Sequence, residues 1–156
     1  MCPATTDLGQ TSVLKFALSK KEEMALEAET NLLIGNETEH LLTMTHYEPG
    51  AKTPLTIRGA VYFNYSYMVI PYAKEGTLLA HLSKRSLTAK YPLETQKYLC
   101  SQVVACVAEL HTTFDIAHMN IKLEHFVMMN KKLKLIDFSM AVELGQPIED
   151  SEKMAR

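Results

Sequence analysis

Tryptophan is absent from this chain, and cysteine is scarce: the 156 residues include three cysteines. An odd number leaves one thiol unpaired in any disulfide scheme, and no Cys-x-x-Cys pair indicates a zinc site. The first residues also lack a basic stretch followed by an apolar one, so no secretory signal is expected. We therefore expect free thiols in a reducing compartment and an intracellular protein, cytoplasmic by default.

The chain also lacks an excess of either charge. Sixteen basic and eighteen acidic side chains give a net charge of −2, which argues against nucleic acid or an anionic membrane as a partner. No apolar run approaches the roughly 20 residues of a bilayer span, so no membrane insertion is expected. Hydrophobic residues make up 47% of the chain, and this composition and length fit one globular domain rather than two large lobes.

The N-terminal part of the sequence predicts a strand followed by a helix. Residues 12–18 are rich in β-branched and aromatic side chains, which favour a strand. Residues 19–34 are rich in helix formers, with Ser19 and Glu22 in a capping-box arrangement. Gly35 is a natural end for this helix.

The middle of the sequence predicts a loop and two strands. Residues 48–54 contain two prolines and a glycine, which favour a loop. Residues 55–63 and 65–72 are strand-like, and Asn64 between them suggests a hairpin.

The longest predicted element is a helix over residues 93–114, opened by Pro92. Its apolar positions recur at helical spacing and are Leu99, Val103, Cys106, Val107 and Leu110. A short helix is expected over residues 77–82, and a tight hairpin at 130–132 joins two apolar runs, 126–129 and 133–136. Because the helices do not alternate regularly with strands, an α+β fold is favoured over a doubly wound parallel sheet.

The segment from residue 116 to residue 141 resembles the catalytic segment of eukaryotic protein kinases. It contains His118-Met119-Asn120, then His125, then Asp137-Phe138-Ser139, where the family has His-Arg-Asp, an asparagine and Asp-Phe-Gly. The resemblance implies a partial kinase-like fold. It divides the chain into a tail (residues 1–11), a small-lobe remnant (12–72), a large-lobe remnant (73–145) and a polar tail (146–156).

The resemblance also implies roles for individual side chains. Lys15 corresponds to the nucleotide-binding lysine, Glu29 to its partner on the small-lobe helix, and Asp137 to the metal-binding aspartate. These three residues are the nucleotide-binding candidates. Alternatively, Lys15 is a structural or solvated lysine and Asp137 makes local hydrogen bonds. His118 is expected to be a packed core residue beneath Phe138.

Departures from the family pattern predict that the catalytic positions are degenerate. Asn120 replaces the aspartate that accepts the substrate proton, and a neutral amide has no carboxylate to do so. His125 replaces the metal-binding asparagine, and imidazole is a poor ligand for magnesium. Ser139 replaces a glycine, which restricts the backbone. No catalytic residue, metal or cofactor is therefore expected, with ATP and magnesium as the minor alternative.

The sequence also predicts a truncated kinase. Gly9 is the only glycine before Lys15, so a glycine-rich phosphate loop is missing. The large helical half of a kinase also does not follow the Asp137 segment. The long helix would then present an apolar face without its usual cover. Four side chains of that face are the expected partner contacts: Leu99, Val103, Val107 and Leu110.

Together these features predict a catalytically inactive kinase-like protein, a pseudokinase. It would serve as a structural, scaffolding or regulatory subunit of a larger assembly, or bind an intact kinase. One alternative is a residual ATP-binding protein or weak serine/threonine kinase that another chain completes. Another is a degenerating kinase fragment with little function of its own. Nucleotide binding would separate the first two hypotheses.

Overall fold

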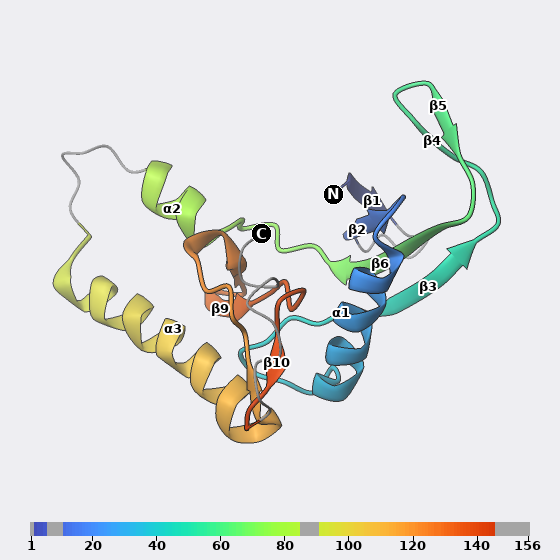
Figure 1. The fold of residues 1–156 in the computed structure, drawn as a ribbon. Coiled ribbons are helices and arrows are strands. Elements are labelled where there is room, and N and C mark those ends of the chain that lie inside the picture. Colours follow the sequence, from blue (N-terminus) through green and yellow to red (C-terminus); the bar gives the residue numbers. More distant parts are fainter. Residues whose placement is uncertain (1, 6–10, 85–90, 146–156) are drawn as a thin grey trace.

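The computed structural model describes residues 2–5, 11–84 and 91–145, and Figure 1 shows their arrangement. The N-terminal part forms a four-stranded antiparallel sheet in the order β1-β2-β6-β3. Its strands are β1 (Cys2–Thr5), β2 (Thr11–Ala17), β6 (Tyr65–Pro71) and β3 (His46–Ala51). The strand predicted over residues 12–18 is confirmed as β2, and the expected N-terminal tail contributes the edge strand β1.

Helix α1 (Lys21–Ile34) packs against β6 and β3. The contact is a small apolar cluster of Met24, Ala28, Met44 and Met68. Gly35 ends the helix, as the sequence predicts, with φ 72°, a positive value that glycine adopts without steric cost.

The capping box predicted at the start of α1 is wrong. The residue before the helix is Lys20, which has φ 40° and makes no side-chain capping bond. Ser19 lies one residue too early to occupy that position, so the match of Ser19 and Glu22 to the capping pattern has no structural counterpart.

The segment predicted as a loop over residues 48–54 is instead largely strand β3. Its pairing with β6 shifts register between Glu48 and Ala51, and Pro49 lies within this irregularity. A proline has no N–H to donate, and a bulge is one of the places where a strand tolerates it. The proline and glycine therefore mark a bulge here rather than a loop.

The hairpin predicted across Asn64 is also wrong. Strand β4 (Leu55–Ile57) pairs with β5 (Ala60–Tyr62) inside the first of the two predicted strands. Arg58 and Gly59 form the turn, and both have positive φ, as in the two-residue turns that suit hairpins. Figure 1 shows that this hairpin extends beyond the end of the sheet.

The C-terminal part contains helices α2 (Leu78–Lys84) and α3 (Leu93–Phe114) and four short strands. The bounds of α3 agree with the sequence prediction, and Pro92 is its N-cap. The strands are β7 (Ile116–Ala117), β8 (Phe126–Met129), β9 (Lys132–Leu135) and β10 (Val142–Glu143), with the 3₁₀ turn η1 (Leu123–His125) before β8. The predicted hairpin of β8 and β9 is confirmed, and Asn130 and Lys131 form its turn with positive φ.

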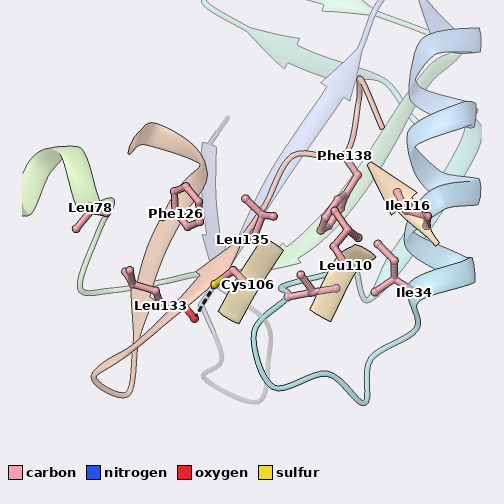
Figure 2. Packing of buried hydrophobic residues seen from close by; sticks show 10 residues of the cluster. Ile34, Leu78, Cys106, Leu110, Ile116, Phe126, Leu133, Leu135 and Phe138 are labelled. Carbon is pink, nitrogen blue, oxygen red and sulfur yellow. Dashed lines mark hydrogen bonds between the residues drawn. The ribbon is translucent and has the colours of Figure 1, made fainter. Parts of the chain in front are cut away.

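The main core lies between α3 and the β8–β9 hairpin (Figure 2). Leu110, Leu133 and Leu135 are fully buried, and each such burial contributes about 2 kcal/mol. The Cys106 thiol donates a 3.5 Å hydrogen bond to the carbonyl of Leu133. The remaining members of this core are Ile34, Leu41, Leu78, Ile116, Phe126 and Phe138.

This core covers part of the apolar α3 face that the sequence predicts to be bare. Leu110 has no exposed surface, and three partly buried side chains, Leu99, Val103 and Val107, pack against the core. Leu110 is therefore unavailable to a partner, whereas Leu99, Val103 and Val107 keep part of their surface exposed, so their role as partner contacts stays a prediction. The apolar side chains that α3 does expose include Leu93 and Val104.

Backbone hydrogen bonds join the two parts of the chain. Leu42 donates to the carbonyl of Leu135 at 2.9 Å, and Leu135 donates to the carbonyl of His40 at 2.8 Å. Met128 on β8 donates to Gly76, which follows β6, at 2.8 Å. These bonds join the segment after α1 to the end of β9, and the segment after β6 to β8. Among the described residues, no helix is long and apolar enough to cross a membrane.

Candidate functional site

Lys15 of β2 lies at the centre of a cluster of charged side chains. Its ammonium group donates to both carboxylate oxygens of Glu27, at 2.8 and 2.7 Å, and to Asp137 Oδ1 at 2.9 Å. Glu27 comes from α1, whereas Asp137 follows β9, so the three side chains tie together elements from both parts of the chain. Glu27 is 3% exposed, which makes its pairing with the ammonium group essential.

His125 completes this cluster from the other side of Asp137. Its Nε2 lies 3.0 Å from Asp137 Oδ2, and its Nδ1 lies 2.9 Å from the carbonyl oxygen of Asn120. Both ring nitrogens therefore face oxygens that can accept hydrogen bonds. We call Lys15, Glu27, Asp137 and His125 the charge cluster.

The local backbone sets the position of each carboxylate. Glu27 lies on the buried side of α1, which also contains Met24, Ala28 and Asn31, and so points toward the sheet. Asp137 has φ 68°, a left-handed conformation that aspartate adopts more readily than most residues. This turn directly after β9 presents its carboxylate to both Lys15 and His125.

Burial and charge act in opposite directions on these groups. Burial alone would lower the pKa of Lys15, but the two neighbouring carboxylates outweigh it and raise that pKa. Burial alone would raise the pKa of Asp137, yet the hydrogen bond and charge of Lys15 hold it below its usual value. For Glu27 burial is the larger effect and raises the pKa. At neutral pH the cluster thus contains an ionised Asp137 beside a charged Lys15.

His118 supports the loop that carries Asn120. Its Nε2 lies 3.0 Å from the carbonyl oxygen of Ile136, and its Nδ1 accepts a 3.3 Å hydrogen bond from the Asn120 N–H. A neutral ring with its proton on Nε2 satisfies both contacts, and burial lowers the pKa of His118. Its ring centroid lies 5.7 Å from that of Phe138, so the prediction of a packed core histidine is confirmed.

The structure brings together only some of the predicted site residues. Two of the three candidates, Lys15 and Asp137, form an ion pair, but the predicted pairing of Lys15 with Glu29 is wrong, because Glu29 lies exposed on another side of α1. Glu27 takes its place. The signal for Glu27 was its spacing from Met24, Ala28 and Asn31, which places it on their side of the helix.

Two surface hollows lie away from the charge cluster. One of about 340 Å³ adjoins β3 and β6 and is lined by Glu48, Lys52 and Tyr67 among others. The other, about 300 Å³, lies near the end of α3, with Phe114 and Leu144 in its lining. Neither is lined by a residue of the cluster.

Residues 12–155 match the protein kinase domain, and this match covers most of the chain. A comparison with curated proteins gave no match. The chain belongs to the protein kinase domain family.

Membership of this family gives the cluster a chemical context. In protein kinases a strand lysine pairs with a helix glutamate, and magnesium is held by the Asp-Phe-Gly aspartate and a catalytic-loop asparagine. In this chain Lys15 of β2 pairs with Glu27 of α1 and with Asp137 of the Asp-Phe-Ser segment. His125, which the resemblance aligns with that asparagine, lies 3.0 Å from Asp137 Oδ2.

The residues of the site do not fit a magnesium ion. Magnesium needs oxygen ligands in a near-octahedral arrangement at about 2.0–2.1 Å. His125 offers nitrogen rather than oxygen, and it already engages Asp137 Oδ2. Within the described part of the chain, no group of three or more histidine, cysteine, aspartate or glutamate side chains could hold a metal ion.

Proposed function

We propose that this member of the protein kinase family is catalytically inactive and acts through protein contacts, as a structural, scaffolding or regulatory subunit of a protein assembly. The observation that supports inactivity is the loop from His118 to His125. At the position where the family has its proton-accepting aspartate, this loop carries Asn120.

Asn120 cannot perform the chemistry of the residue that it replaces. Its side-chain amide has no ionisable oxygen to accept a proton from a substrate hydroxyl. Its backbone N–H bonds to His118 and its carbonyl oxygen bonds to His125, so two histidines determine how the loop is held. Together with the poor fit to magnesium, this arrangement leaves phosphoryl transfer without a proton acceptor and without charge neutralisation.

Incubation of the pure chain with radiolabelled ATP, magnesium or manganese, and a generic protein substrate tests this half of the proposal. We expect no transfer of labelled phosphate to the substrate or to the chain itself. Asn120→Asp alone should not restore transfer, because His125 still engages Asp137. Transfer by the wild type that disappears in Asn120→Ala would contradict the proposal.

Apolar side chains on the surface support the second half. Leu26, Leu32 and Leu33 of α1 are between 56% and 70% exposed, and Phe63 beside the β4–β5 hairpin is 66% exposed. Large exposed side chains that cluster on one helix are typical of surfaces that bind other proteins. A subunit of an assembly would bury such side chains against its partners.

The role in protein contacts can be tested on residues 1–156 alone, by measuring their size in solution, dye binding and melting temperature. We expect the isolated chain to oligomerise or to bind a hydrophobic dye, and Leu32→Lys with Leu33→Lys to reduce both effects. The control Leu93→Lys, on another helix, should change them less. A monodisperse monomer that melts sharply at high temperature and binds no dye would contradict dependence on a partner.

A second candidate is a residual ATP-binding protein or weak kinase that another chain completes. This candidate is favoured by the ion pairs that bring Lys15, Glu27 and Asp137 together, although these pairs form without a nucleotide. This candidate requires that ATP bind and that Lys15→Met abolish the binding. Phosphotransfer that appears only when a partner is added would support it over the first.

A further inference from the structure

We propose that His125 determines the ion specificity of this site: it takes the position of a metal ion beside Asp137 and thereby excludes divalent cations. The site would then keep its kinase-like arrangement without a metal. This inference goes beyond catalytic inactivity, since many inactive sites could still bind a metal ion.

The carboxylate oxygens of the charge cluster already have nitrogen partners. Glu27 contributes two oxygens, and Lys15 donates to both at 2.8 and 2.7 Å. Asp137 contributes two more, one bonded to Lys15 at 2.9 Å and the other next to His125 at 3.0 Å. Every carboxylate oxygen of the charge cluster thus faces a nitrogen. A metal ion would have to displace one of these nitrogens or approach alongside it.

His125 is held in place by its side chain and by its backbone. Its side chain is 7% exposed, and its Nδ1 contacts the Asn120 carbonyl oxygen at 2.9 Å. Its backbone N–H donates to Lys122, and its carbonyl accepts from Ile136, both at 2.9 Å. Rotating the ring away from Asp137 would therefore give up the bond to Asn120 and disturb a packed position. A metal ion gains too few ligands here to offset that loss.

The space beside Asp137 is also unfavourable for a cation. A divalent ion at about 2.1 Å from Oδ2 would lie close to the His125 ring that faces this oxygen, and near the ammonium group of Lys15. The ammonium group repels a cation in a partly buried setting. Lys15 also offsets part of the carboxylate charge, so the cluster attracts an added ion less strongly.

As a structural consequence, the charge cluster links the two parts of the chain without a ligand. Lys15 connects β2 with α1 through Glu27, and Asp137 connects both with the loop that carries His125. In the metal-dependent arrangement of the family, the ion supplies part of this connection. In this chain the imidazole ring supplies it.

Manganese is a suitable probe, because it substitutes for magnesium and broadens the NMR signals of nearby amides. In the wild type we expect no selective broadening of the amides around Asp137, and no change of melting temperature with magnesium. His125→Asn restores an oxygen ligand and frees Oδ2. It should bind manganese at least roughly tenfold more tightly, with broadening centred on residues 136–138. The control His111→Asn, on an exposed part of α3, should behave as the wild type.

Two results would overturn the inference. The first is selective broadening around Asp137 in the wild type, which can be measured even if no variant folds. The second is a folded His125→Asn that binds manganese no better than the wild type. Because neither readout depends on phosphotransfer, metal binding by an inactive wild type would refute this inference and leave the proposed inactivity standing.

Discussion

Replacement of Lys15 by methionine should destabilise the folded chain strongly. Methionine keeps the volume and the apolar stem of the side chain but removes the ammonium group between Glu27 and Asp137. Two carboxylates would then lie close together without the ammonium group that pairs with both, and Glu27 is buried. Breaking a buried ion pair by removal of one partner typically costs 3–5 kcal/mol.

The exposure of the partners reduces this figure. The side chains of Lys15 and Asp137 are 23% and 24% exposed, so water relieves part of the penalty. We therefore expect a loss of about 2–3 kcal/mol in the free energy of unfolding at neutral pH. The matched control is Lys97→Met, which removes an exposed pair with Glu94 on α3. An exposed pair of this kind contributes about 0.5 kcal/mol or less.

The loss of stability caused by Lys15→Met should also depend on pH. Without Lys15 the pKa of Glu27 should rise further, since burial already raises it in the wild type. A carboxyl group with a raised pKa in the folded state favours folding below its unfolded pKa and opposes it as pH rises through the folded value. The difference between Lys15→Met and the wild type should therefore be largest at neutral pH and smaller at about pH 5.

Urea unfolding followed by circular dichroism measures these differences, because the chain has no tryptophan to report by fluorescence. The reasoning would be refuted if Lys15→Met lost no more stability than Lys97→Met. It would also be refuted if the loss were the same at both pH values.

Three further predictions follow from the packing. Leu110→Ala should cost about 3 kcal/mol, whereas Val104→Ala, at a position 66% exposed, should cost under about 0.5 kcal/mol; equal losses in urea unfolding would mean that α3 faces the other way. Burial lowers the pKa of His118 below its ordinary 6.5. The neutral ring therefore contributes to stability above that pH, and this contribution is lost as the pH falls through the pKa that His118 has in the folded state. When the free energy of unfolding is measured from neutral pH downward, His118→Gln should make this pH-dependent loss smaller, whereas the control His111→Gln should not. Burial raises the pKa of Cys106 to about 12, so in a Cys2→Ser background a thiol reagent should modify the exposed Cys100 and spare Cys106; equal labelling rates would contradict the burial.

Local sequence signals predict the C-terminal elements well. Helix α3 has Pro92 at its start and a long 3.6-residue apolar repeat, and both signals depend only on neighbouring residues. The β8–β9 hairpin has Asn130 in its turn, a residue that tolerates the left-handed conformation found there. These elements form where the sequence places them because packing and local preference agree.

The sequence predicts the C-terminal elements better than it predicts which glutamate of α1 belongs to the charge cluster. The leucines of α1, such as Leu26 and Leu33, suggest an apolar side that faces the core, but they are exposed. The buried side is built from Met24, Ala28 and Asn31, whose residue types are weaker signals. The resemblance implied Glu29, and the apolar residues of α1 carry no clear local signal that favours Glu27 instead.

The apolar pattern of α3 shows which side avoids water but not what covers that side. Val103 and Leu110 pack against a hairpin that begins more than ten residues after the helix ends, and only the three-dimensional arrangement reveals this contact. A single sequence carries little information on such long-range pairs. The same limit applies to His125, whose bond to Asp137 depends on two separate turns.

Calorimetric titration of ATP with magnesium into the wild-type chain tests the central claim most directly. The claim is that the kinase-like cluster is held by its own side chains and does not serve a metal–nucleotide complex. We predict either no binding heat or an affinity weaker than about micromolar. A sub-micromolar Kd, which corresponds to about −8 kcal/mol or better and depends on both magnesium and Lys15, would contradict the claim.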